Sequence, residues 1–168
     1  MTDFDVFPEK FPGRIAKQAY IDSGMLLRSL REPSPVSIRT NSEKWNKQAY
    51  QSKPVPWCKD GWYLESRPSF TLDPLFHAGC YYPQEASSMF LEQIFLQVAD
   101  VKPDLRILDL CGAPGGKSTH LSTLIGDKGL LVSNEVIRQR ASVLAENLTK
   151  WGLSNSVVTQ ADPGSFSR

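Results

Sequence analysis

Residues 107–118 combine the residue types and spacing in this chain that are most suggestive of chemistry. They read Ile107-Leu-Asp-Leu-Cys-Gly-Ala-Pro-Gly-Gly-Lys-Ser118, an apolar run that ends in an acid and is followed by a glycine-rich turn. Glycines let a backbone approach a ligand closely, and α/β sheets bind nucleotide-like ligands where such a turn follows a strand. We therefore predict a strand ending at Asp109, a binding loop stiffened by Pro114, and a helix.

Two better-known glycine loops do not fit this stretch. A phosphate-binding P-loop requires a glycine five positions before Gly116-Lys117-Ser118, and that position is Cys111. The dinucleotide motif G-x-G-x-x-G does not match the spacing of the glycines at 112, 115 and 116. A nucleotide-binding protein that tolerates Cys111 is a weaker alternative.

Three acids follow the three strands that we predict in this half of the chain. Asp109 ends the first, Glu135 ends the second, and Asp162 follows the third. Glu135 lies 19 residues after Gly116, close to the offset of about 20 residues at which an acid reaches a ribose hydroxyl. Asp162 could accept a hydrogen bond from an adenine amino group. Each acid could instead cap the turn or helix that follows it, but the set and the loop together favour a pocket for S-adenosylmethionine.

The same residues resemble a known family. Residues 109–121 are similar to the cofactor loop of the Nol1/Nop2/Sun family of RNA cytosine-5 methyltransferases, whose bacterial members modify ribosomal RNA. Pro35–Asn41 with Lys44 resembles the family's entry motif, and Gly79–Met89 resembles the segment that leads into its catalytic domain. The resemblance covers nearly the whole chain and implies S-adenosyl-L-methionine as cofactor and ribosomal RNA as partner.

The resemblance also implies which residues make up the sites. The cofactor-binding residues would be Asp109, Cys111, Gly112, Ala113, Pro114, Gly115, Gly116, Lys117, Glu135 and Asp162, and RNA would be contacted by Arg39, Asn41 and Lys44. In the family the loop lysine lies close to the target base, so Lys117 is a candidate accessory catalytic residue. It could instead be a surface lysine in a first helical turn, but a cation there opposes the helix dipole, and this favours a functional role.

The cysteines of this chain depart from the family pattern. Members use one cysteine in a Pro-Cys segment after the fourth strand and another in a Thr-Cys segment after the fifth. This chain ends at Arg168, and its three cysteines do not lie in Pro-Cys or Thr-Cys segments; they are Cys58, Cys80 and Cys111. One such thiolate adds to cytosine C6 so that C5 can attack the sulfonium methyl. We expect an N-terminal portion of such an enzyme that binds cofactor but is inactive alone. A non-catalytic module that binds S-adenosylmethionine or RNA is the main alternative.

Composition excludes several classes of protein. The chain has 168 residues, of which 40% are hydrophobic and 22% charged, as in ordinary globular proteins. The sequence contains neither a secretory signal nor an apolar run of membrane-spanning length, so we predict a cytoplasmic protein without a membrane partner. Three scattered cysteines do not form a disulfide framework. Cys58, His77 and Cys80 lack zinc-ribbon spacing, and we predict no metal site.

The net charge of +1 does not by itself indicate a nucleic-acid-binding protein. However, Lys10–Arg67 contains eleven Lys or Arg against five Asp or Glu. Tyr and Trp residues are interleaved with them, at Tyr20, Trp45, Tyr50, Trp57, Trp62 and Tyr63. Cations and flat rings are typical of RNA-binding surfaces, although aromatic residues at this density more often form a core.

The pattern of elements predicts two regions. Residues 1–82 form a small α+β RNA-binding domain, with two helical segments in 13–31 broken at Ser23-Gly24, a strand at Val36–Thr40 and short β pieces in 54–76. Residues 83–168 form an α/β domain, the first half of a class I Rossmann-like methyltransferase sheet. Its expected elements are a helix over 84–99, strands from 107, over 129–135 and over 156–161, and helices over 117–125 and 137–151. The first strand should have one open edge.

Overall fold

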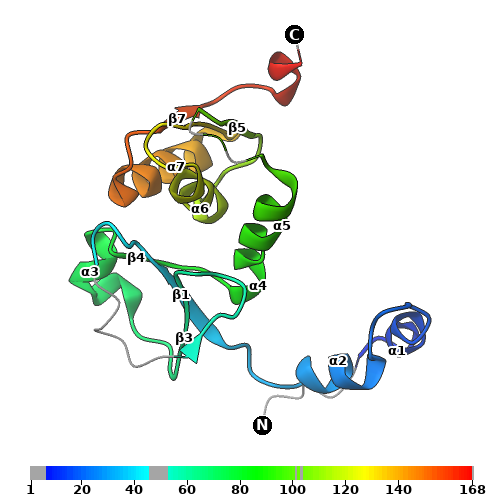
Figure 1. The fold of residues 1–168 in the computed structure, drawn as a ribbon. Helices are drawn as coiled ribbons and strands as arrows, with labels where there is room; N and C mark the ends of the chain where they lie inside the picture. The colour runs from blue at the N-terminus through cyan, green and yellow to red at the C-terminus, as the bar shows by residue number, and fades with distance from the viewer. Residues whose placement is uncertain (1–6, 46–52, 101, 103, 168) are drawn as a thin grey trace. The chain divides into compact units, whose positions relative to one another are not determined.

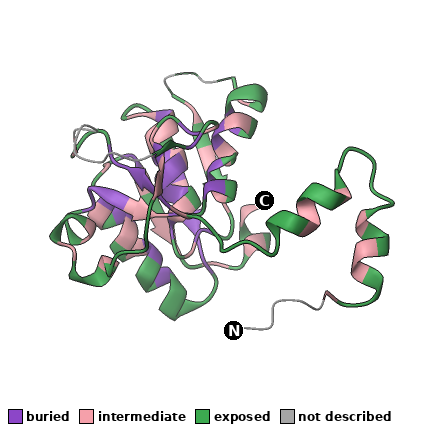
Figure 2. Ribbon diagram, turned by 90° about the horizontal axis from the view of Figure 1, so that it is seen from below, coloured by how far each residue is buried: buried purple, intermediate pink, exposed green. Residues whose placement is uncertain are grey.

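The computed structural model describes residues 7–45, 53–100, 102 and 104–167. The chain divides into two compact units, residues 1–35 and 36–168. The first unit contains α1 (Lys10–Ile15) and α2 (Ser23–Ser29), with no buried residue in either helix (Figures 1 and 2). Asp22 caps α2, because its Oδ1 accepts a hydrogen bond from the Met25 N–H at 2.8 Å. The predicted break at Ser23-Gly24 is therefore wrong: these residues begin the second helix.

An antiparallel sheet opens the second unit. Its strands are β1 (Val36–Thr40), β2 (Lys53–Pro54), β3 (Gly61–Leu64) and β4 (Tyr81–Pro83), in the order β2-β3-β1-β4. Ile38 of β1 and Tyr81 of β4 are almost fully buried and form one core cluster with Cys80. The prediction of a strand at Val36–Thr40 is confirmed. The region 54–76 is less β-rich than predicted, because η2 (Phe70–Leu72) and α3 (Pro74–His77) occupy its end.

The single helix predicted over 84–99 is two helices, α4 (Ala86–Met89) and α5 (Leu91–Val98). The Gln84 N–H donates to the Ser37 carbonyl at 3.2 Å, so pairing with β1 continues one residue past β4 and delays the helix. At Phe90 the N–H bonds to the Ser87 carbonyl, three residues back, which tightens the chain between the helices. The predicted helix is therefore interrupted, and of its apolar side chains Met89 and Phe95 are buried whereas Phe90, Ile94 and Val98 are exposed.

A parallel sheet with two helices forms the rest of this unit. β5 (Arg106–Asp109), β6 (Leu130–Asn134) and β7 (Ser156–Thr159) pair in the order β5-β6-β7. α6 (Gly116–Ile125) and α7 (Arg138–Trp151) connect them and lie on the same side of the sheet (Figure 1). α6 and α7 end at Ile125 and Trp151, the ends predicted from the sequence, and the glycines that follow, Gly126 and Gly152, have positive φ. η3 (Pro163–Phe166) follows β7.

Strand β5 lies at one edge of this sheet and, in the part of the chain that the structure describes, pairs only with β6. Leu108 on β5 is 42% exposed and Val157 on β7 is 49% exposed. The open edge predicted for the first strand of this sheet is confirmed, as is the α/β fold class. The predicted domain division between residues 82 and 83 lies inside the second unit and stays a prediction. Within the described ranges, no helix is both long and apolar enough to cross a membrane.

Candidate cofactor site

The glycine-rich loop leaves the carboxyl end of β5, and Asp109 fixes its path. One oxygen of the Asp109 carboxylate accepts a hydrogen bond from the Ser118 hydroxyl at 2.7 Å, and the other accepts one from the Cys111 N–H at 3.3 Å. Ser118 lies in the first turn of α6, so this acid connects the end of the strand to the start of the helix. Asp109 therefore shapes the loop from within.

Two glycines allow this loop to pack against its surroundings. A Cβ at Gly112 would lie 2.8 Å from the Ser118 hydroxyl oxygen and 3.1 Å from a methyl group of Leu144 on α7. Gly115 has φ of 116°, a conformation that other residues rarely adopt. The loop is thus built for close backbone approach, as its sequence predicts.

Side chains from β4 and α7 hold the carbonyl groups of the loop. The Pro114 carbonyl accepts hydrogen bonds from Asn147 Nδ2 at 2.7 Å and from the Tyr82 hydroxyl at 3.3 Å. The Ala113 carbonyl accepts one from Arg140 Nη2 at 3.0 Å. Burial raises the pKa of Tyr82, so this phenol remains a donor at neutral pH. The loop is therefore held from both sides.

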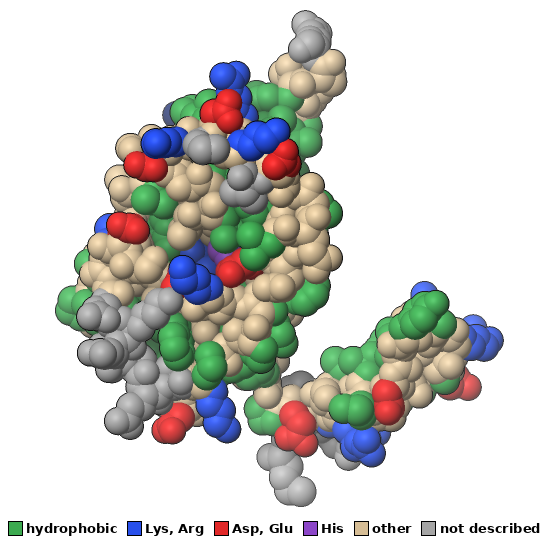
Figure 3. Space-filling model, in the orientation of Figure 1, with side chains coloured by type: hydrophobic (Ala, Val, Ile, Leu, Met, Phe, Trp, Pro, Cys, Tyr) green, Lys and Arg blue, Asp and Glu red, His purple; other side chains and the backbone are tan. Residues whose placement is uncertain are grey.

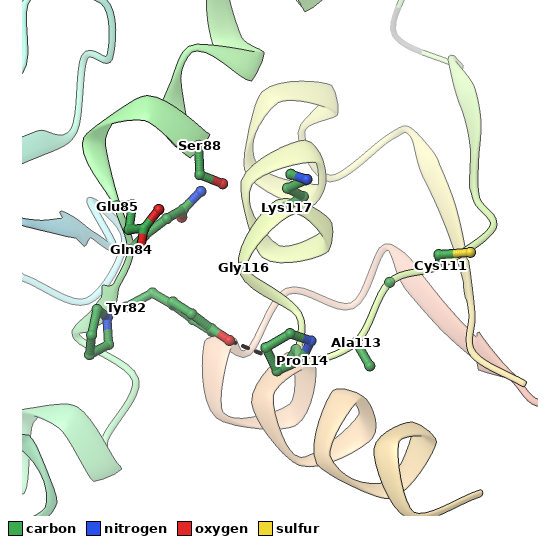
Figure 4. A pocket seen from close by; sticks show the side chains of 11 residues that line it. Tyr82, Gln84, Glu85, Ser88, Cys111, Ala113, Pro114, Gly116 and Lys117 are labelled. Atoms are coloured by element: carbon green, nitrogen blue, oxygen red, sulfur yellow. Dashed lines mark hydrogen bonds between the residues drawn. The ribbon is translucent and has the colours of Figure 1, made fainter. Parts of the chain in front are cut away.

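A cavity of about 260 Å³ lies between this loop and the segment before α4. Figure 4 shows Gln84, Glu85 and Ser88 on one side of it and Cys111 and Ala113 on the other. Its lining is formed by Tyr82, Pro83, Gln84, Glu85, Ser88, Cys111, Gly112, Ala113, Pro114, Gly116 and Lys117. Of the predicted cofactor residues, the structure thus brings together those of the loop from Cys111 to Lys117, with the exception of Gly115.

Glu135 lies immediately after β6 and is buried, with 4% of its surface exposed. Its Oε1 accepts a hydrogen bond from the Ile137 N–H at 3.1 Å, and its Oε2 lies 3.4 Å from Arg140 Nη1. Oε2 has no hydrogen-bond partner among the described residues. A buried carboxylate oxygen with spare acceptor capacity at a strand end is suited to a ligand hydroxyl.

Asp162 is exposed and is the N-cap residue of η3, where its Oδ1 accepts a hydrogen bond from the Gly164 N–H at 2.8 Å. Asp162 therefore has the capping role that was the alternative to ligand binding for each of the three acids. The predicted adenine contact would have to use the remaining carboxylate oxygen, and it stays a prediction.

The three residues predicted to contact RNA use their donors within the protein. Arg39 is 1% exposed; its Nε donates to Gln84 Oε1 at 3.0 Å, and its Nη2 donates to Thr119 Oγ1 at 2.6 Å and the Gly116 carbonyl at 3.3 Å. Its guanidinium also lies 4.4 Å from the ring centre of Trp151. Burial lowers the pKa of Arg39 to about 10, so it remains charged. Arg39 thus joins β1 to the start of α6.

Asn41 and Lys44 attach the same segment to the end of α7. Asn41 Nδ2 donates to the carbonyls of Trp151 at 2.9 Å and Gly79 at 3.2 Å. Lys44 Nζ donates to the Lys150 carbonyl at 2.6 Å, where a cation complements the negative end of the helix dipole. These contacts favour a structural role, and direct RNA contact stays a prediction. Sequence reasoning missed this role because the partners of Arg39 and Asn41 lie 80 and 110 residues away.

Two family models match the chain. One, described as the N-terminal domain of 16S rRNA methyltransferase RsmF, matches residues 7–86. The other, described as 16S rRNA methyltransferase RsmB/F, matches residues 96–168. This chain belongs to the RsmB/F family. The predicted Nol1/Nop2/Sun resemblance is thereby confirmed, and membership of a methyltransferase family supports S-adenosyl-L-methionine as the cofactor.

Curated relatives of this RsmB/F family chain carry a consistent name. "Ribosomal RNA small subunit methyltransferase F" of Shewanella loihica is 35% identical over 82% of this chain and 31% of its own length. The protein of the same name from Aeromonas hydrophila is 34% identical over 99% of this chain and 38% of its own length. The chain therefore spans about a third of the length of these relatives.

Solved structures share the fold. A methyltransferase homologue from Pyrococcus horikoshii is 29% identical, with a TM-score of 0.71 over 86% of this chain and 50% of that one. NSun6 from the same organism, solved with SFG, is 16% identical, with a TM-score of 0.71 over 93% of this chain and 66% of that one. The similarity to NSun6 supports the fold alone.

The aromatic residues of the N-terminal half pack mainly inside this RsmB/F family chain. Trp45 and Trp62 contact the cluster around Ile38 and Tyr81, and Trp57 and Tyr63 contact a second cluster. Tyr20 is exposed, and Tyr50 lies outside the described residues. On the face drawn in Figure 3, Lys and Arg side chains are interspersed with Asp and Glu. The high density of aromatic residues in this half of the chain is therefore explained mainly by packing in hydrophobic cores.

Sequence reasoning missed one buried polar cluster, formed by Cys58, Glu92 and His120. His120 Nε2 lies 3.0 Å from Glu92 Oε2 and 3.9 Å from Cys58 Sγ. Burial raises the pKa of Cys58 to about 12. In contrast, Cys58, His77 and Cys80 do not meet, because His77 bonds the Thr71 carbonyl and Cys80 lies in another core cluster. The spacing of 34 and 28 residues between the clustered side chains gives no recognisable motif.

Proposed function

We propose that this chain carries the S-adenosyl-L-methionine site of an rRNA cytosine-C5 methyltransferase. The observation that supports this most is the loop of residues 109–117, which leaves the carboxyl end of a parallel strand in a chain of the RsmB/F family. Parallel α/β sheets bind their ligands at this edge. RNA is the expected partner, and a cytoplasmic location stays a prediction.

The residues present fit this cofactor. A bound adenosyl group needs an acceptor for its ribose hydroxyls, and we assign this role to Glu135, which does not itself line the cavity and whose Oε2 has no hydrogen-bond partner among the described residues besides its ion pair with Arg140. It also needs backbone that can approach closely, and the loop glycines that line the cavity are Gly112 and Gly116. A P-loop protein would instead direct its loop at phosphates, and the neighbouring carboxylates Asp109 and Glu135 would repel them.

The chemistry is divided between the cofactor and the protein. S-adenosyl-L-methionine supplies an activated methyl group when bound. The described residues would bind and orient the cofactor. Tyr82, Asn147 and Arg140 hold the loop, and Glu135 lies at a strand end. The family's two catalytic cysteines have no counterpart among Cys58, Cys80 and Cys111. We therefore expect residues 1–168 alone to bind cofactor and to give no methyl transfer above background.

Lys117 has a separate proposed role. It lies at the start of α6 and lines the cavity with Glu85 and Ser88 (Figure 4). A cation at the N-terminal end of a helix opposes the dipole, so its place is better explained by an anionic or polar partner. We propose that Lys117 faces the target nucleotide.

Calorimetry with S-adenosylmethionine, S-adenosylhomocysteine and ATP tests the cofactor assignment. We expect binding of both adenosyl-sulfur compounds and none of ATP. Binding of ATP alone would favour the nucleotide-binding alternative and contradict the proposal. Methyl transfer to ribosomal RNA by residues 1–168 would contradict the expected dependence on further cysteines while leaving the cofactor assignment intact.

A further inference from the structure

Three side chains with metal-binding atoms meet in the interior of the unit formed by residues 36–168. The Cys58 thiol comes from the turn between β2 and β3, the Glu92 carboxylate from α5 and the His120 imidazole from α6. Their relative exposures are 4%, 7% and 2%. One potential ligand atom from each lies within 4.8 Å of the others. The cluster is thus created by the packing of three separate segments.

The separations between these atoms are close to those of a zinc site. Zinc binds sulfur at about 2.3 Å and nitrogen or oxygen at about 2.0–2.1 Å, which at a tetrahedral angle places sulfur about 3.6 Å from nitrogen and nitrogen about 3.3 Å from oxygen. The observed distances are 3.9 Å from Cys58 Sγ to His120 Nε2 and 3.0 Å from that nitrogen to Glu92 Oε2. Each of these two pairs needs an adjustment of only about 0.3 Å to reach the zinc values, and the third pair, the Cys58 sulfur and a Glu92 carboxylate oxygen, lies within 4.8 Å.

The arrangement does not fit a nucleophilic triad. In a triad the nucleophile and the acid contact opposite nitrogens of the histidine ring. Here both the thiol and the carboxylate approach the same atom, His120 Nε2, and the Cys58 side chain is buried. Two explanations account for three potential ligand atoms that converge on one point: a proton shared between the three side chains, or a bound cation. The proton arrangement is the competing explanation.

The histidine is compatible with coordination through Nε2. Its Nδ1 has no hydrogen-bond partner in the described part of the chain, so it can carry the ring proton and leave Nε2 free for an ion. Mixed sulfur, nitrogen and oxygen ligands suit a borderline divalent ion such as Zn²⁺ and are unlike the all-oxygen sites of Mg²⁺ and Ca²⁺. One thiolate and one carboxylate would balance its two positive charges.

We propose that Cys58, Glu92 and His120 form a site for a divalent transition-metal ion, best matched by Zn²⁺, with water as the fourth ligand. The ion would join the turn before β3 to α5 and to α6, the helix that follows the cofactor loop. Binding would release the proton of the Cys58 thiol. None of the three residues lines the cavity beside the loop, so the ion's role would be to stabilise the packing of these elements.

Cobalt substitution tests this site in the complete 168-residue chain after treatment with a chelator. We expect one equivalent of Co²⁺ per chain, a near-ultraviolet absorption band from thiolate coordination, and displacement of Co²⁺ by Zn²⁺. The thermal midpoint should rise by a few degrees with excess Zn²⁺, because an ion that binds only the folded state stabilises it. Absence of stoichiometric binding to the folded chain would overturn the proposal and favour the shared proton.

Matched thiol variants locate the binding. Cys58→Ser should abolish the thiolate band, whereas Cys80→Ser, another buried cysteine, and Cys111→Ser, an exposed one, should retain it. Loss of the band in Cys111→Ser with retention in Cys58→Ser would identify adventitious binding at the surface and contradict the site. If Cys58→Ser does not fold by circular dichroism, Glu92→Gln serves instead and should weaken Co²⁺ binding at least tenfold; unchanged affinity would contradict the site.

Discussion

At the scale of single residues, Glu135 is the acid whose surroundings best suit a ligand. It is buried at the end of β6, and its Oε2 has no hydrogen-bond partner in the described ranges. We expect Glu135→Gln to weaken S-adenosylhomocysteine binding about tenfold, because a hydrogen bond to a charged group contributes about 1.5–3 kcal/mol. Calorimetry measures the change. The exposed Glu146→Gln on α7 is the control, and equal affinity for both variants would exclude this role.

Arg39 supports a different prediction at the same scale, because its donors reach Gln84, Thr119 and the Gly116 carbonyl. Arg39→Met would remove the donor to the buried Gln84 Oε1 and to Thr119 Oγ1, while the Gly116 carbonyl would keep its hydrogen bond from the Thr119 hydroxyl. We therefore expect the free energy of unfolding to fall by about 2–3 kcal/mol. Urea denaturation measures this, and the exposed Arg106→Met on β5 should lie within about 0.5 kcal/mol of the unmodified chain. Weaker RNA binding with an unchanged urea midpoint would instead support the predicted direct RNA contact.

At the scale of elements, the loop before α6 depends on one unusual backbone conformation. Gly115 has φ of 116°, and a Cβ there would lie 3.3 Å from the Asn147 side chain. We expect Gly115→Ala to lower stability by about 1–3 kcal/mol, because non-glycine residues in such conformations are strained. Gly13→Ala is the matched control, since Gly13 lies in α1 and a Cβ added to it would have no neighbour within 4 Å. Equal thermal midpoints for both variants would contradict the strain argument.

The sequence predicted the parallel half of this fold better than the antiparallel half. Gly126 and Gly152 marked the ends of α6 and α7 because a helix end with positive φ is a local property. The later start of α4 was missed because it depends on the pairing of Gln84 with Ser37, a residue of the distant strand β1. The acids at 109 and 135 were correctly placed at strand ends, while the buried contacts of Arg39 and His120 arise only from packing between distant segments.

At the scale of the whole molecule, the unit formed by residues 36–168 joins two sheets through polar contacts. Arg39 connects β1 to α6, Asn41 connects the same segment to the end of α7, and Tyr82 reaches the cofactor loop. The four-stranded sheet therefore helps to position the loop. A substitution in the four-stranded sheet should therefore alter cofactor binding even if the substituted residue does not contact the cofactor.

The exposed edge of β5 leads to the last prediction, which concerns stability of the 168-residue chain. Among the described residues β5 pairs with β6 on one side only, and a strand with an open edge and exposed apolar side chains promotes association. We therefore expect aggregation on heating and a midpoint below about 60 °C. Leu108→Lys should reduce light scattering with little change in the midpoint, because Leu108 is 42% exposed. Ile107→Lys should lower the midpoint, because Ile107 packs against the cluster of Phe95, Ile125 and Leu131. A monomeric, two-state melt above about 60 °C for the unmodified chain would show that the open edge does not limit its stability.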